Sequence, residues 1–379
     1  MDERWLIDQF KWLHRHPELG LREYETTAFV KDALRKHGVE LLDAELETGA
    51  IAVVGRKDGP VVGLRCDMDA LPIQEASGLD YASENAGVMH ACGHDFHTAC
   101  MLGAALLLKE REASLPGAVK VIFQPAEEID NGAKLVVATG MLDDVRAFYA
   151  VHSYPWFEPG TLGIKAGPVM GAADRFAIRL KGRGAHAAHP EKSVDVIPAL
   201  AAVIGSAQSV VSRNVSPFDC AVVSVTRVQA GTTWNIIPGE AELEGTVRTL
   251  SPAVRDDVQR RLEQVVRLTA EAYGCAAEIE FERGTDPVVN DASACERAAA
   301  LAREMGFTVD RQEDALEAED FSDYLNIAPG AFIRVGTGGT CAAHHPGFTA
   351  DPAALLPAAR YFAALAEREL ERLSREDMR

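Results

Sequence analysis

The sequence has no long apolar run, no regular cysteine framework and no export signal, and each absence excludes a class of protein. The longest apolar-rich run, ACMLGAALLL at 99–108, is about half of the ~20 residues that a membrane-spanning helix needs. The seven cysteines are odd in number and irregularly spaced, so we expect reduced thiols and no disulfide framework. The opening MDERWLIDQF is acidic and amphipathic, which predicts no signal peptide. We therefore expect a cytoplasmic protein.

Basic residues are also in the minority. The chain has 38 basic and 57 acidic residues and a net charge of −19, which argues against nucleic acid or an anionic membrane as a partner. Internal repeats and low-complexity linkers are missing. A chain of 379 residues is too long for one ordinary core, so we expect two domains.

The chain does contain short apolar runs, rich in β-branched residues, that end in polar clusters. PVVGLR precedes Cys66, Asp67 and Asp69; AVKVIFQPA precedes Glu127 and Glu128; AFYAV precedes His152; and GAFIRVGTGG precedes His344 and His345. Helical stretches such as 97–112 and 132–140 separate these runs, which predicts an α/β fold with a mainly parallel sheet. Ligands bind beyond the carboxyl ends of such strands, so we expect the polar clusters to meet at one edge of the sheet.

The middle third of the chain has a different pattern. Its strands alternate apolar and polar residues, as in DRFAIRLKGRG and AELEGTVRTL, which is typical of antiparallel strands with one buried face. Helices are expected near 193–213 and 252–273. We predict a smaller α/β sandwich at 174–284, inserted into a larger domain formed by 1–173 and 285–379.

The densest group of potential metal ligands is MHACGHDFHT at 89–98. Each candidate ligand in this stretch and in the other polar clusters has an ordinary structural explanation. His94 and His152 could be core histidines, and Glu127–Glu128 could be a solvated helix start. These explanations become improbable together, because all would have to coincide at one sheet edge. Cys, His and carboxylate ligands suit zinc or a similar ion, and two such ions ~3.5–4 Å apart form a hydrolytic site. Adjacent glutamates fit this site, since one can bind metal while the other takes a proton from water.

Seven motifs carry a resemblance to a known family. They are RCDMDALP, MHACGHDFHTA, FQPAEE, GRGAHAAHP, TTWNIIP…EGTVRTL, EDFSDYL and HHPGF. In this order they resemble the amidohydrolase branch of the aminoacylase/carboxypeptidase family of dinuclear metallopeptidases, whose members include hippurate hydrolase, auxin-conjugate hydrolases and N-acetyldiaminopimelate deacetylase. The resemblance spans nearly the whole chain, from LHRHPELG to HHPGF.

The resemblance implies a role for each matching residue. The metal ligands would be Cys92, His94, Glu128, His152 and His344, holding two divalent ions (zinc, manganese, cobalt or nickel) with Cys92 between them. Glu127 would be the general base and acid. Asp67 and Asp69 would orient the ligands, although helix capping is an alternative for both.

The inserted domain would be a lid that also forms the interface of a homodimer or larger homo-oligomer. His186 would stabilise the oxyanion, and Asn235 and Arg248 would contact polar groups of the substrate; a surface salt bridge is an alternative for Arg248. His189 and Glu191 depart from the family pattern beside His186, so we expect them to influence substrate choice.

Two further departures lie near the expected site. Ile129–Asp130 replaces the usual glycine-rich turn, and Cys341 joins the two adjacent histidines. None of the departures removes an expected ligand.

The expected reaction is hydrolysis of an N-acyl amino acid, often N-acetyl, to a carboxylate and the free amino acid. Three alternatives remain. A dipeptidase or carboxypeptidase would use the same residues for catalysis. A catalytically inactive metal-binding or regulatory protein would use only the metal ligands. A nucleotide-dependent oxidoreductase is disfavoured, because no GxGxxG follows the first strand.

Overall fold

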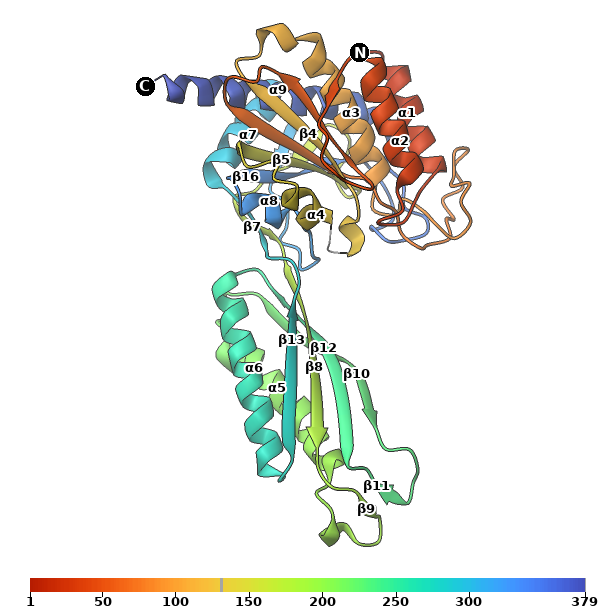
Figure 1. The fold of residues 1–379 in the computed structure, drawn as a ribbon, viewed down its shortest axis with the longest axis vertical. Coiled ribbons are helices and arrows are strands. Elements are labelled where there is room, and N and C mark those ends of the chain that lie inside the picture. The colour runs from red at the N-terminus through yellow and green to blue at the C-terminus, as the bar shows by residue number, and fades with distance from the viewer. Residues whose placement is uncertain (130–131, 379) are drawn as a thin grey trace. The chain divides into compact units, whose positions relative to one another are not determined.

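The computed structural model describes residues 1–129 and 132–378, which form two compact units. The first unit comprises Met1–Val169, Val289–Glu313 and Asp320–Arg379, and the second comprises Met170–Val288 and Asp314–Glu319. Strands β7 (Gly167–Met170) and β14 (Val288–Asn290) lie where the chain passes from one unit to the other. Each unit has its own sheet (Figure 1). Each also has its own hydrophobic core.

In the described part of the first unit, eight strands form one sheet in the order β1-β2-β4-β3-β5-β16-β6-β15. They are β1 (Glu40–Leu41), β2 (Ala50–Gly55), β3 (Val61–Asp67), β4 (Ala118–Gln124), β5 (Val145–Tyr154), β6 (Thr161–Gly163), β15 (Thr308–Asp310) and β16 (Gly330–Gly336). The central strands β4, β3, β5 and β16 run parallel, whereas β2 and β6 join them antiparallel. The predicted mainly parallel α/β sheet is confirmed.

The central strands are buried along their length because helices cover both faces of the sheet. On one face, the strands share a core with α1 (Glu3–Arg15), α2 (Tyr24–Lys36), α3 (His94–Glu110), α7 (Ala292–Glu304) and α9 (Leu355–Asp377). Val62, Leu64 and Cys66 of β3 belong to this core. Because side chains alternate along a strand, Arg65 and Asp67 point to the opposite face.

That opposite face is covered by the short helices α4 (Gly132–Ala138) and α8 (Ser322–Leu325). Phe321 packs on Phe332 of β16 and Tyr324 on Phe148 of β5, with ring centroids 6.1 and 5.4 Å apart. These contacts place α8 against the strands that carry the polar clusters.

The apolar run at 99–108 is part of α3, which is buried from His94 to Leu108 and contacts α1, α9 and β3. A helix that is apolar on all sides is typical of the core of a large domain. Its buried N-terminal turn carries His94 and His97 of the stretch MHACGHDFHT.

In the second unit, four antiparallel strands form a sheet in the order β10-β12-β8-β13. They are β8 (Ala172–Lys181), β10 (Ala221–Ala230), β12 (Glu240–Thr249) and β13 (Ala276–Arg283). Helices α5 (Val196–Asn214) and α6 (Pro252–Ala272) pack on the apolar face of this sheet. A separate two-stranded ladder joins β9 (Ala185–His186) to β11 (Ile236–Ile237).

Helix α5 bears on the expectation that no segment of the chain spans a membrane. By length and composition alone it is apolar enough to cross a membrane, although no such segment was predicted. Val196, Leu200 and Val203 of α5 are buried in the core of the second unit. Helices that pack against a core pass the same test, so α5 is weak support for a membrane span.

A buried ion-pair network joins α1 to α3. His14 Nδ1 lies 2.6 Å from Asp95 Oδ2, and His14 Nε2 lies 3.1 Å from Glu75 Oε1. Burial alone would lower the pKa of His14, but Asp95 and Glu75 outweigh it and raise the pKa from 6.5 to about 9. The protonated ring therefore holds α1, the loop around Glu75 and the first turn of α3 together.

We predict that His14 stabilises the protein only while it is protonated. Because its pKa is raised by folding, this contribution is complete below pH 6.5 and is lost as the pH rises through about 9. Its size is on the order of 3 kcal/mol. Urea unfolding of metal-free wild type and His14→Gln should show a large difference near about pH 6 and a small one near about pH 10. A difference that is equal at both pH values would contradict the charged network.

Candidate metal and catalytic site

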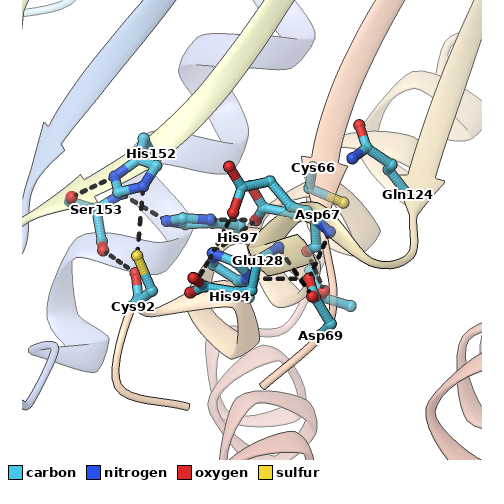
Figure 2. A network of polar contacts seen from close by, with 12 residues as sticks. Cys66, Asp67, Asp69, Cys92, His94, His97, Gln124, Glu128, His152 and Ser153 are labelled. Carbon is cyan, nitrogen blue, oxygen red and sulfur yellow. Dashed lines mark hydrogen bonds and ion pairs between the residues drawn. The ribbon is translucent and has the colours of Figure 1, made fainter. Parts of the chain in front are cut away.

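The polar residues that follow the central strands lie together in the first unit (Figure 2). Asp67 ends β3, and His152 lies near the end of β5. Glu127 and Glu128 open a short 3-10 helix (Glu127–Ile129) three residues after β4 ends. Residues far apart in the sequence therefore meet at one edge of the sheet, where the parallel strands end.

All five predicted metal ligands fall into two overlapping groups. Cys92, His94 and His152 form one group, and Cys92, Glu128 and His344 form the other. Within each group the possible ligand atoms all lie within 4.8 Å of one another. Cys92 belongs to both groups, which is the arrangement that a bridging ligand requires.

Two histidines, the buried His94 and the half-buried His152, each turn one ring nitrogen toward this space. His152 Nδ1 lies 2.8 Å from the Ser153 carbonyl oxygen and donates to it, because a carbonyl can only accept. His152 Nε2 is thus left as a lone pair, 3.7 Å from Cys92 Sγ. His94 Nδ1 lies 3.3 Å from Asp69 Oδ1, and its buried Nε2 has no hydrogen-bond partner among the residues described. Metal-bound histidines are held in this way, with the second nitrogen donating to a carbonyl or carboxylate.

Asp69 also fixes the backbone of both glutamates. Its Oδ1 accepts the N–H of Glu127 and its Oδ2 accepts the N–H of Glu128, each at 3.1 Å. Asp69 is 1% exposed. One buried carboxylate therefore connects the ring of His94 to the turn that carries Glu127 and Glu128.

His97 was not predicted as a site residue, although it lies in the stretch MHACGHDFHT. It is buried one turn after His94, and its Nε2 accepts the Ser153 N–H at 2.6 Å. Its Nδ1 therefore carries the proton and donates to Asp67 Oδ1 at 2.5 Å. Burial outweighs Asp67 and lowers the pKa of His97, which keeps the ring neutral. The i,i+3 spacing from His94 was the signal in the sequence, since it places both rings on one helix face.

Asp67 is part of a second buried network. Arg65 donates to Asp67 Oδ2 and to Asp320 Oδ1, both at 2.7 Å, and to Gln124 Oε1 at 2.8 Å. Burial alone would raise the pKa of Asp67, but His94, His97 and Arg65 outweigh it and hold the pKa well below its ordinary value. Asp67 is therefore negatively charged, and it lies next to the rings of His94 and His97.

The turn between Cys92 and His94 depends on its glycine. Gly93 has φ +82°, and a Cβ at this position would lie 2.4 Å from Ser153 Oγ. Burial and the nearby Glu128 raise the pKa of the Cys92 thiol to about 12. Metal binding at Cys92 would therefore be coupled to release of a proton.

His344 is more exposed than the other predicted ligands. Its side chain is 54% exposed, and its Nε2 lies 3.4 Å from Glu128 Oε2. Its N–H donates to the Ala91 carbonyl oxygen at 2.8 Å, which ties the loop after β16 to the segment before Cys92. Cys341 and His345 lie on the same loop, where His345 Nδ1 accepts the Gly347 N–H. Ile129 and Asp130 replace the glycine-rich turn that is usual in the family. Ile129 is exposed, and Asp130 lies outside the described residues.

The remaining predicted residues belong to the second unit. His186 lies in β9, and the exposed His189 and Glu191 follow it, with His189 Nδ1 3.5 Å from Glu191 Oε1. Asn235 precedes β11, and its carbonyl oxygen accepts the Ala187 N–H. Arg248 lies in β12, and its buried Nη1 has no hydrogen-bond partner in the part of the chain that the structure describes. The surface salt bridge considered for Arg248 is therefore not formed among these residues.

The residues of the first unit fit metal ions. His94 Nε2 and Glu128 Oε1 are both buried and without hydrogen-bond partners among the described residues, 3.8 Å apart. Leaving such atoms without hydrogen bonds costs free energy, and metal ions bound at this site would remove that cost. Thiol, imidazole and carboxylate donors suit zinc and similar transition ions.

Comparisons with known proteins agree with this geometry. Residues 63–368 match the model of peptidase family M20/M25/M40. The chain therefore belongs to this family. The family membership predicted from the sequence is confirmed.

Individual relatives extend the comparison. An N-acetylcysteine deacetylase of Bacillus subtilis (strain 168) is 47% identical over 368 residues, which are 97% of each chain. An N-acyl-L-amino acid amidohydrolase of Geobacillus stearothermophilus is 42% identical over 295 residues, 75% of this chain and 80% of that one. A crystal structure of a dinuclear metal-binding peptidase of the M20 family from Bacillus subtilis has a TM-score of 0.89 at 43% identity, covering 97% of this chain and 98% of that chain. The prediction of a hydrolase that acts on amide bonds is confirmed.

We predict that Asp69→Asn destabilises the metal-free protein. An asparagine has one acceptor oxygen, so its NH₂ group would face the N–H of Glu127 or Glu128, and one buried donor would lose its partner. The expected loss is about 1–3 kcal/mol in urea unfolding. Asp291→Asn is the matched control, because Asp291 accepts the Ala294 N–H as an N-cap and asparagine caps equally well. Equal stability of the two variants would contradict the role of Asp69.

Proposed function

We propose that this protein is a metal-dependent amidohydrolase that cleaves N-acyl amino acids to a carboxylate and the free amino acid. The observation that carries the proposal is that two ligand groups share Cys92 beside a further glutamate, Glu127. The relatives support the substrate class, since two of them are named for N-acetylcysteine and for N-acyl-L-amino acids. We propose an N-acetyl group as the first acyl group to test.

Two divalent ions per subunit are proposed, held by Cys92, His94 and His152 on one side and by Cys92, Glu128 and His344 on the other. When bound, such ions acidify water and polarise the amide carbonyl. Zinc, manganese, cobalt and nickel all suit these donors. Within the described residues all seven cysteines are free, which fits a thiol ligand and the proposed cytoplasmic location.

Glu127 is the proposed general base and acid. Its side chain is largely buried, and its Oε2 lies 3.9 Å from His94 Nε2, next to the ligand atoms. Its backbone N–H is held by Asp69, which would aim the carboxylate toward the ligand atoms while Glu128 binds metal. It would take the proton from the attacking water and then give it to the leaving amine. Asp67 and Asp69 would keep the ligands oriented.

The second unit is proposed to act as a lid, about 174–284, and as the interface of a homodimer. His186 would stabilise the oxyanion in its own subunit or across the dimer. Asn235 would contact polar groups of the substrate. His189 and Glu191 would adjust substrate choice beside His186.

Arg248 is proposed to bind the carboxylate of the amino acid. A buried guanidinium atom without a partner fits an anionic group, and the free carboxylate distinguishes N-acyl amino acids from simple amides. Dipeptides also carry this group, so the dipeptidase alternative is separated by comparing turnover of N-acetyl amino acids with that of dipeptides.

We predict that Glu127→Gln keeps its metal but loses most turnover, because the amide cannot accept the proton from water. The expected loss exceeds the ~10²–10⁴-fold that is typical of one general acid–base step, since Glu127 serves two steps. Elemental analysis and initial rates on N-acetyl amino acids measure the two properties together.

The matched control is removal of the metal itself. Chelation should abolish the activity of the wild type, and added metal should restore it. Near-normal rates in metal-loaded Glu127→Gln would refute the assignment of the base. Activity that survives exhaustive chelation and is lost only on thiol alkylation would refute the metal-dependent mechanism.

We predict that Arg248→Gln removes the preference for a free carboxylate. We compare kcat/KM for an N-acetyl amino acid with kcat/KM for its carboxamide. The ratio of the two should fall about 10- to 100-fold, because the variant loses the free energy of one hydrogen bond to a charged group. Arg175→Gln is the control, because Arg175 is exposed and already paired with Glu244 and Glu282. An equal loss on both substrates in Arg248→Gln would argue against carboxylate binding.

A further inference from the structure

The turn that carries Glu127 and Glu128 has a strained backbone. Ala126, directly before Glu127, has φ +55°, in the left-handed region that non-glycine residues rarely adopt. Ala126 is fully buried, so no solvent contact explains the conformation. Strain of this kind persists only where the surrounding structure holds it.

Asp69 holds the turn through the N–H groups of Glu127 and Glu128, and Glu23 holds it through the N–H of Ala126. Glu23 Oε1 accepts the Ala126 N–H at 2.8 Å, and Glu23 is 0% exposed. The two residues are 103 positions apart in the sequence. Glu23 is therefore a buried acid whose carboxylate reaches the backbone of the strained residue.

The usual reasons for an acid at this position do not apply. Glu23 is the N-cap residue of α2, but its side chain makes no capping hydrogen bond. Glu18 accepts the N–H groups of Glu25 and Thr26 instead. Within the described chain Glu23 makes no ion pair, so neither helix capping nor charge pairing accounts for the cost of burying it.

The rest of this segment packs on the same turn. Glu18 accepts the Ala70 N–H through its carbonyl oxygen at 2.8 Å. A Cβ on Gly20 would lie 3.2 Å from Ala126 Cα and 3.2 Å from Asp69 Oδ2. The loop between α1 and α2 thus contacts both Asp69 and Ala126, although it contains no residue of the site itself.

We propose that Glu23 is a positioning residue that holds Ala126 in its left-handed conformation and thereby aims Glu127 and Glu128 at the metal ligands. Its effect on turnover rests on the proposed amidohydrolase function. Its effect on the turn does not, and can be measured in the metal-free protein.

The test is a double-mutant cycle between Glu23 and Ala126. Glu23→Met keeps the volume but removes the acceptor, whereas Glu23→Gln keeps an acceptor oxygen. Glycine adopts positive φ without strain, so Ala126→Gly removes the need for the hydrogen bond. Four proteins are compared: wild type, both single variants and the double variant. The readouts are the urea midpoint without metal, cobalt(II) affinity, kcat and KM.

Glu23→Met should lower kcat about 10- to 100-fold, as a small misplacement of a catalytic group does, with KM changed less. It should also lower the urea midpoint and weaken cobalt(II) binding, because Glu128 lies on the same turn. Glu23→Gln should retain most of each property. In the double variant, Ala126→Gly should restore at least part of all three losses.

Two controls isolate the coupling. Glu45 is exposed and has φ +46°, so Glu45→Gly relieves strain elsewhere and should not rescue Glu23→Met. Glu369 is a buried acid paired with Arg297 and Arg372, and the losses in Glu369→Met should not be restored by Ala126→Gly. If Glu23→Met does not fold, Glu23→Asp takes its place in the double-mutant cycle, because its side chain is shorter by one methylene.

Additive effects of the two substitutions would overturn the proposal, because they would show that Glu23 does not act through Ala126. Unchanged kcat and cobalt(II) affinity in Glu23→Met would also overturn it. If the wild type hydrolyses no N-acyl amino acid with any metal, the proposed function fails. The urea and cobalt(II) readouts would still decide the role of Glu23.

Discussion

Buried polar atoms must be paired, and the site consists of atoms whose ordinary partners leave one lone pair free. The Ser153 carbonyl holds one nitrogen of His152, and Asp69 holds one nitrogen of His94. The remaining nitrogens face Cys92 Sγ within one group. His94 Nε2 has no hydrogen-bond partner among the described residues, and a thiolate at Cys92 would be a buried negative charge. A cation at this position would satisfy both groups.

Three parts of the fold supply that geometry. The parallel strands bring their carboxyl ends to one edge, and the turn at Gly93 places Cys92 and His94 at the start of α3. The loop after β16 contributes His344, tied to Ala91 through its backbone. The apolar helices have a supporting role: α3 is buried along its length, so its first turn cannot shift without disturbing the core.

The sequence predicted the parts that have a local signal. Apolar runs ending in polar residues gave the central strands, and the Cys-x-His spacing identified the start of α3 as a candidate site. Strand β10 was not predicted, because a register shift between Val225 and Arg227 breaks its alternation. Contacts such as Glu23 with Ala126 and Arg65 with Asp320 join residues 103 and 255 positions apart, and no local pattern indicates them. The roles of the predicted ligands and of the second unit stay predictions.

The central claim is that Cys92 lies between two metal ions at the strand ends. Anomalous diffraction from crystals of the metal-loaded protein tests it most directly. The account predicts two peaks ~3.5–4 Å apart, both in contact with the Cys92 sulfur, with His94 and His152 on one ion and Glu128 and His344 on the other. A single peak, or two peaks that Cys92 does not contact, would contradict it.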